Sequence, residues 1–251
     1  MLTDEFLISL KQRYIDTIAK LNRDKAFEIK TWDFINKAGK IEVNVSRGDV
    51  FEKACVSVIC STVTIPDRDH QSTIQWLGIE TFPATPLIPK FMGVFEHVSE
   101  LGLERCPGFF DVYPVIPFDE DKAFLQNEFA VVAGKHGITF EDLQKGYQRM
   151  FRTKETDTGI GYGIGIAFGP EEDNFPYFQD AASAILKAYF QVVEKRKDEK
   201  YTPEQIDQMF QFRSEWVKFC FIDNRFFQGG VQLGVPPESF MLHMLPPVVK
   251  F

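Results

Sequence analysis

Residues 188–223, AYFQVVEKRKDEKYTPEQIDQMFQFRSEWVKFCFID, contain the strongest local folding signals of the chain. Apolar residues at helical spacing lead to the cations of residues 195–197, which favour the carboxyl end of a helix dipole. Residues 202–204, Thr-Pro-Glu, predict the start of a second helix, with an N-cap, a proline at the first helical position and an acid in the first turn. Residues 216–222 are mostly apolar without a helical period and predict a strand. We therefore expect a helix–helix–strand unit.

The totals of the chain exclude several classes of protein. Its 251 residues are 44% hydrophobic and 25% charged, which suits one globular domain with a sizeable core over residues 1–251. A formal charge of -8 argues against nucleic acid or an anionic membrane surface as the main partner. No apolar run approaches the roughly 20 residues of a membrane span, and the amino-terminal segment does not have the pattern of a signal peptide.

The cysteines and histidines predict no metal site. The four cysteines include no CxxC pair, and the four histidines are dispersed without ligand spacing. Free, largely buried thiols are typical of a reducing compartment, so we expect a cytoplasmic protein.

Outside the first stretch, strands predominate over strand–helix alternations. Residues 40–46 alternate in polarity, residues 47–49 predict a turn, and residues 50–60 form an apolar run, so the two segments predict a β-hairpin. This predominance predicts the α+β class, with a large, mainly antiparallel sheet sandwiched between helices. The further segments that we expect are strands at 75–82, 91–97 and 109–113, and helices at 6–21, 123–135, 140–149 and 180–195.

Asp111 is a charged residue in an unexpected place. It follows Gly108-Phe109-Phe110 inside an apolar, aromatic strand, where carboxylates are uncommon. It could cap a neighbouring backbone amide at an edge or turn. Alternatively, it could face a ligand cavity as an acid with a raised pKa. The residues alone leave both interpretations open.

Two glycine-rich segments have different interpretations. Residues 158–169, TGIGYGIGIAFG, alternate strictly and do not contain the GxGxxG fingerprint, so a dinucleotide-binding loop is not predicted. Alternating glycines instead favour a strand that another backbone or a flat ligand approaches closely. Residues 229–230 and 234–237 predict a loop near the carboxyl end.

Several blocks, in their order along the chain, resemble oxygen-dependent coproporphyrinogen III oxidase. The resemblance is clearest in AYxxVVEKRK, YTPEQ, a helix with Arg213, and WVKF leading to Arg225. Further blocks resemble the same family at residues 48–56 (GDVFEKACV), 111–114 (DVYP), 159–161 (GIG) and 238–247 (ESFMLHMLPP). The chain departs from the family pattern mainly where the family carries cations. Leu87 replaces a histidine, and Glu96 and Thr158 each replace an arginine.

The resemblance implies a site for a small-molecule tetrapyrrole, no metal or organic cofactor, molecular oxygen as co-substrate, and a homodimer. It implies that Asp111 is the catalytic carboxylate that holds the pyrrole N–H groups. Arg225 would pair with a propionate, and Ser57 would donate to another. A turn salt bridge for Arg225, and a strand hydroxyl bonded to the backbone for Ser57, are the alternatives.

Two other functions stay open on the same residues. Ferredoxin-dependent bilin reductases resemble this architecture and also use an aspartate on a central strand. Glu80 and Asp111 could then form a proton-donating pair toward an open-chain tetrapyrrole. The third alternative is a non-catalytic homologue that binds a tetrapyrrole.

Overall fold

The computed structural model describes residues 2–64, 69–139, 141–142, 161–162 and 175–250. Its helices and strands are, in chain order, α1 (Glu5–Leu21), β1 (Glu28–Asp33), β2 (Gly39–Ser46), β3 (Phe51–Thr64), β4 (Gln71–Pro83), β5 (Lys90–Glu100), β6 (Leu103–Arg105), β7 (Gly108–Tyr113), α2 (Asp119–Lys135), α4 (Phe175–Arg196), α5 (Pro203–Ile222), α6 (Arg225–Gln232) and α7 (Pro237–Met244).

The described strands form one seven-stranded sheet in which every neighbouring pair is antiparallel. The order is β1-β2-β3-β4-β5-β6, and β7 also pairs with β5. β6 and β7 therefore share one edge of β5, β6 at its carboxyl end and β7 along its amino-terminal half. The predicted α+β class with an antiparallel sheet is confirmed.

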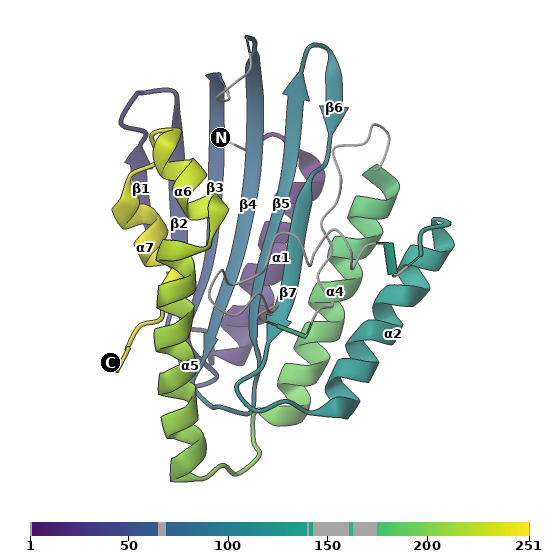
Figure 1. Cartoon of the computed structure of the whole chain (residues 1–251), viewed down its shortest axis with the longest axis vertical. Helices are drawn as coiled ribbons and strands as arrows, with labels where there is room; N and C mark the ends of the chain where they lie inside the picture. The colour runs from purple at the N-terminus through teal and green to yellow at the C-terminus, as the bar shows by residue number, and fades with distance from the viewer. Residues whose placement is uncertain (1, 65–68, 140, 143–160, 163–174, 251) are drawn as a thin grey trace.

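Helices cover both faces of this sheet (Figure 1). Because side chains alternate along a strand, Phe110 and Val112 of β7 pack toward α1, α2 and α4, whereas Phe109 and Tyr113 pack toward α5, α6 and α7. The sheet surface that carries the second set is called the α5 face below. Each face has its own buried apolar cluster.

The strand predicted for residues 216–222 is wrong, because α5 continues through them as a helix. Its buried residues Trp216, Phe219 and Cys220 recur at i, i+3 and i+4, whereas Phe221 and Ile222 are 44% and 50% exposed. The predicted helix start is confirmed: Thr202 and Gln205 form a reciprocal capping box. Helix formation from this start, with burial of one face, overrides the strand preference of the aromatic run.

The loop predicted at residues 229–230 is also wrong, because both glycines lie in α6. The Asn224 side chain accepts hydrogen bonds from the first amides of this helix, and the ring of Phe240 lies where a side chain on Gly230 would be. Most of the helix predicted at 140–149 and most of the strand predicted at 158–169 lie outside the described residues. None of the described helices has the length and apolar character needed to cross a membrane.

Candidate functional site

A cavity of about 190 Å³ lies on the α5 face, between β3, β4 and β5 and the helices α6 and α7. A concave, mainly apolar space with a few polar groups is the usual form of a small-molecule site. Its apolar walls include Phe34, Ile59, Ile74, Trp76, Met92, Val94, Phe109, Phe226, Leu233, Val235, Phe240 and Met244. The polar side chains that line it are Ser61, Glu80, Glu96, Asn224 and His243.

Glu80 is a fully buried carboxyl in the wall of this cavity. Its Oε1 forms an ion pair with Lys90 Nζ at 2.5 Å, and neither carboxylate oxygen has a hydrogen-bond partner in the described part of the chain. Burial raises the pKa of Glu80 to about 7, and the charge of Lys90 opposes part of that rise. A carboxyl that titrates near neutrality can exchange a proton with a ligand at physiological pH.

Lys90 is buried beside this carboxyl and among aromatic rings. Its Nζ lies 3.4 Å from the ring centroid of Trp216, 5.0 Å from that of Tyr113 and 5.2 Å from that of Phe82. Cation–π attraction and the carboxylate of Glu80 both stabilise the ammonium there, although burial lowers the pKa of Lys90. The predicted site did not include Lys90. The alternation of β5, which places it on the α5 face, is the signal that could have found it.

Glu96 is a second carboxyl in the cavity wall, on the strand next to that of Glu80. It is half-buried and lies opposite Trp76 in the register of β4 and β5. Among the described residues its carboxyl has no hydrogen bond or ion pair, and burial raises its pKa to about 7. The cavity wall therefore contains two carboxyl groups, and burial destabilises the ionised form of each.

Ser57 lies on the α5 face behind His243 and does not line the cavity itself. It is fully buried in β3, and its Oγ lies 3.1 Å from His243 Nδ1, so its partner is an imidazole of α7. Burial, with the charges of Lys53 and Lys90, holds the pKa of His243 well below its usual value and keeps the ring neutral. His243 was also missing from the predicted site, because only the placement of α7 brings it to the cavity.

Asp111 is buried in β7 and also lies outside the cavity lining. Its Oδ1 accepts a hydrogen bond of 2.7 Å from Val112 N, and a Cβ on Gly161 would overlap its Oδ2. Glu80 and Asp111 both lie opposite Met92, in β4 and β7 respectively. The backbones of the two acids are therefore separated by a whole strand, about 10 Å. The geometry does not bring them together as an adjacent pair.

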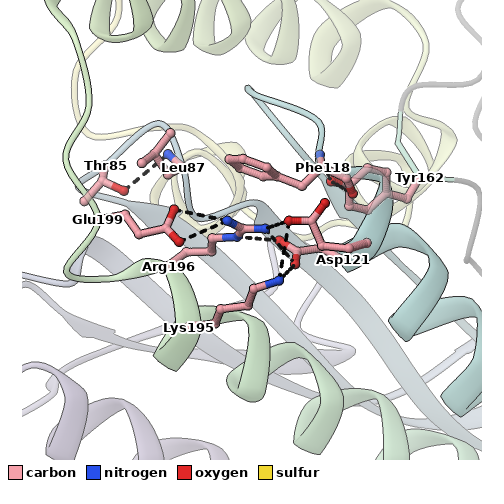
Figure 2. Close-up of polar contacts among 9 residues, drawn as sticks. Thr85, Leu87, Phe118, Asp121, Tyr162, Lys195, Arg196 and Glu199 are labelled. Carbon is pink, nitrogen blue, oxygen red and sulfur yellow. Dashed lines mark hydrogen bonds and ion pairs between the residues drawn. The ribbon is translucent and has the colours of Figure 1, made fainter.

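A polar cluster between α2 and α4 fixes the chain next to β7 (Figure 2). Tyr162 donates its backbone N–H to Val112 O at 2.8 Å, and its hydroxyl oxygen accepts from Phe118 N at 2.9 Å. The guanidinium of Arg196 lies 3.6 Å from the ring centroid of Phe118 and donates to both carboxylate oxygens of Asp121. This bidentate, buried pair joins the two helices.

Two further residues were named from the sequence, Arg225 and Leu87. Arg225 is the first residue of α6, and its side chain is outside the described part of the structure. Leu87 is buried, and its backbone N–H donates to Thr85 Oγ1 (Figure 2). Within the described ranges no group of three or more His, Cys, Asp or Glu residues is arranged to hold a metal ion.

Known proteins resemble this chain in sequence and in fold. Residues 3–251 match the family described as coproporphyrinogen III oxidase. The oxygen-dependent coproporphyrinogen-III oxidase of Francisella philomiragia is 30% identical over 272 residues, which cover 97% of this chain and 88% of the relative. The same enzyme of Francisella tularensis subsp. novicida is 29% identical, over 99% of this chain and 89% of the relative.

A solved structure shares the fold at low sequence identity. Phytochromobilin synthase from tomato, in complex with biliverdin, superposes with a TM-score of 0.59 over 92% of this chain and 80% of that chain, at 11% identity. The sequence match spans almost the whole chain and includes a relative at 30% identity. The chain belongs to the coproporphyrinogen III oxidase family.

Proposed function

We propose that this protein acts on a tetrapyrrole and catalyses the oxygen-dependent oxidative decarboxylation of porphyrinogen propionates in haem biosynthesis. The observation that carries this proposal is the family match over residues 3–251, with curated oxidases aligned along nearly the full chain. The cavity on the α5 face supports it, because it combines aromatic walls with a buried carboxyl that titrates near neutrality.

The reaction is balanced with oxygen as the only oxidant. Each propionate loses carbon dioxide and a hydride equivalent from the carbon next to the ring, which leaves a vinyl group. Oxygen takes the hydride equivalent and one proton from solvent and becomes hydrogen peroxide. In this proposal no metal or organic cofactor takes part.

The proposed residue roles follow from which residues line the cavity and which lie behind its wall. Glu80 is the carboxyl best situated to accept a pyrrole proton, since it is buried at the cavity wall with one oxygen unpartnered among the described residues. The family resemblance favours Asp111 for this role. Gly161 lies directly against the Asp111 carboxyl, so Asp111 would reach a ligand only after the backbone at Gly161 moves away. Arg225 and Ser57 are proposed for the propionates, Ser57 through His243.

A bilin reductase activity is the second candidate. The fold shared with phytochromobilin synthase favours it, together with Glu80 as an acid that could protonate an open-chain tetrapyrrole. A tetrapyrrole-binding homologue without catalysis is the third. We further propose a single-domain cytoplasmic homodimer, following the resemblance to the family.

Anaerobic incubation with coproporphyrinogen III, followed by oxygen, separates these candidates. The oxidase proposal expects released carbon dioxide and, once the excess oxygen has oxidised the porphyrinogen product to the porphyrin, protoporphyrin fluorescence; folded protein that yields neither contradicts it. Biliverdin with a reducing ferredoxin system tests the reductase through a blue-shifted absorption spectrum. If neither substrate reacts, titration with haem and biliverdin tests binding alone.

A further inference from the structure

His243 brings an imidazole from α7 to the wall of the cavity on the α5 face. Its Nδ1 lies 3.1 Å from the Oγ of Ser57, a residue of β3 behind that wall. The ring therefore meets the cavity with its opposite edge, which carries Nε2. Within the described residues the contact with Ser57 is the only hydrogen bond of the imidazole, so Nε2 can bond to a ligand in the cavity.

The hydroxyl of Ser57 determines which ring nitrogen carries the proton. Burial, with the charges of Lys53 and Lys90, holds the pKa of His243 well below its usual value, so the ring is neutral and has one N–H. Ser57 is fully buried, and among the described residues Nδ1 is the only hydrogen-bond partner of its hydroxyl. If Nδ1 were the protonated nitrogen, the hydroxyl hydrogen would be buried without an acceptor, which is costly. Ser57 therefore donates to Nδ1, and the proton of the ring is on Nε2.

Contacts on both sides of His243 fix the backbone of α7. Lys53 Nζ donates to Leu242 O at 2.6 Å, and Trp216 Nε1 donates to Met244 O at 2.9 Å. The two carbonyls next to His243 in the chain are therefore held, one from the sheet and one from α5. The imidazole cannot leave the wall unless these buried donors lose their acceptors, and such a loss is unfavourable.

The indole of Trp76 fixes the plane of the imidazole. The two ring centroids are 5.7 Å apart with an interplanar angle of 70°, an edge-on contact. Gly78, which lies opposite Ser57 in the register of β3 and β4, provides the room for the indole, because a Cβ on Gly78 would overlap it. The imidazole is therefore positioned before a ligand arrives, and little side-chain entropy is lost on binding.

We propose that His243 is a ligand-binding residue that donates a hydrogen bond from Nε2 to an oxygen of the ligand, and that Ser57 is the positioning residue that fixes this tautomer. The identification of the ligand as a tetrapyrrole rests on the proposed function. Both candidate substrates have suitable acceptors: propionate carboxylates in a porphyrinogen, and lactam carbonyls as well in an open-chain tetrapyrrole. A fixed, uncharged donor selects the ligand by the position of its oxygen.

Nitrogen-15 NMR of the full chain, labelled at histidine, measures the tautomer directly, because protonated and unprotonated ring nitrogens differ in chemical shift. We expect the signals of His243, identified by their loss in His243→Gln, to show a protonated Nε2 and an unprotonated Nδ1 at pH 7. Ser57→Ala should populate the other tautomer, whereas Ser61→Ala, on the same face of β3, should not. A protonated Nδ1 in the parent protein, or a tautomer that Ser57→Ala leaves unchanged, overturns the assignment.

Two amide variants separate a role toward the ligand from a role toward Ser57, in absorption titrations with coproporphyrin III and biliverdin. The amide of glutamine reaches as far as Nε2, whereas that of asparagine reaches only as far as Nδ1. His243→Gln should therefore bind both ligands within about 3-fold of the parent, and His243→Asn should bind at least one of them about 10-fold more weakly. Glu215→Gln, at an exposed acid of α5, is the control and should bind as the parent does. Equal binding by the two amide variants, or the opposite order, with intact circular dichroism, contradicts the proposal.

The two ligands identify the oxygen, and the design separates this inference from the oxidase proposal. Weaker binding of coproporphyrin III by His243→Asn assigns the acceptor to a propionate carboxylate, and weaker binding of biliverdin alone assigns it to a lactam carbonyl. A parent protein that binds neither ligand overturns the assignment. Because titration needs no turnover, a protein that is inactive with coproporphyrinogen III but shows the difference between the two amide variants retains this inference. An active oxidase without that difference refutes this inference alone.

Discussion

At the scale of single residues, the ion pair of Glu80 and Lys90 dominates the α5 face. Both side chains are almost completely buried, at 0% and 2% exposure. Removing two charges from water is costly, and the 2.5 Å ion pair with the surrounding aromatic rings offsets that cost only while both partners are present. The pair therefore contributes little net stability but strongly penalises the loss of either partner.

Lys90→Met should be severely destabilising for this reason. It leaves Glu80 buried without a cation, which costs about 3–5 kcal/mol in the free energy of unfolding at pH 8. The double variant Glu80→Gln/Lys90→Met should recover most of that loss. Urea unfolding monitored by circular dichroism measures both.

Lys40→Met is the control, since the ion pair of Lys40 with Asp33 is exposed and should change stability by less than about 1 kcal/mol. A double variant that loses as much stability as Lys90→Met, or more, would contradict the coupling of Glu80 and Lys90.

The raised pKa of Glu96 predicts how the free energy of unfolding changes with pH. Its folded pKa of about 7 lies above the ordinary value of 4.5, so the folded state binds the proton more tightly than the unfolded state. The stability from this group is fully present below about pH 4.5 and is lost as the pH rises through 7. One pKa unit corresponds to about 1.4 kcal/mol, so the loss between pH 5 and 8 is of the order of 1–3 kcal/mol.

Glu96→Gln should flatten this decline, and its advantage over the parent should grow from pH 5 to pH 8. Parallel urea titrations of the parent, Glu96→Gln and Glu215→Gln at both pH values measure it. An identical pH slope in the parent and in Glu96→Gln would mean that Glu96 titrates normally.

At the scale of elements, α5 determines how the α5 face is covered. Trp216 donates from Nε1 to Met244 O at 2.9 Å, which joins α5 to α7. Arg213 donates to Glu52 at 2.6 Å and to Pro83 O at 3.1 Å, which joins the same helix to β3 and β4. Helix α5 therefore contacts both sides of the site: its Trp216 ring packs on Lys90 of the sheet, and its indole N–H bonds to α7, the helix that contains His243.

Thr202→Ala tests the start of this helix. It removes the side-chain oxygen that accepts from Gln205 N and should lower the free energy of unfolding by about 1 kcal/mol. Ser214→Ala is the control, because within the described residues the Ser214 hydroxyl donates only to carbonyls of its own helix, Phe210 O and Gln211 O. Thermal and urea unfolding measure both, and a neutral Thr202→Ala would show that the capping box does not stabilise α5.

The elements also show what the sequence could predict. The hairpin of β2 and β3 followed from its alternation, and the start of α5 from its cap, because both signals are local. The strand prediction for residues 216–222 failed because bulky aromatic residues favour strands on average. These residues form a helix because one helical face is buried against the sheet, which is distant in sequence. Glycines 229 and 230 misled because Phe240, which packs on α6, belongs to another element.

The sequence predicted only part of the candidate site. Glu80 and Ser57 were named from the sequence, and both lie on the α5 face. Lys90 and His243 were not, because the pairing of Lys90 with Glu80 depends on the β4–β5 register and His243 reaches Ser57 only through the placement of α7. Asp111 was singled out, but no local signal could show that Gly161 lies against it.

At the scale of the whole molecule, one antiparallel sheet separates two different layers. Helices α1, α2 and α4 close a continuous apolar core on one face, while α5, α6 and α7 leave a cavity on the other. This arrangement, the family match and the acids in the cavity lead to one central claim. We propose that the protein oxidises a porphyrinogen on the α5 face, with Glu80 at the reacting ring.

The most direct test is the rate at which protoporphyrin fluorescence appears when oxygen is added to anaerobic coproporphyrinogen III with the parent protein, Glu80→Gln/Lys90→Met and Glu215→Gln. The account predicts product from the parent and from Glu215→Gln, and a loss of about 100-fold or more in the folded double variant, the usual contribution of a positioned acid–base group. Absence of product from the folded parent, or full activity in the double variant, would contradict it.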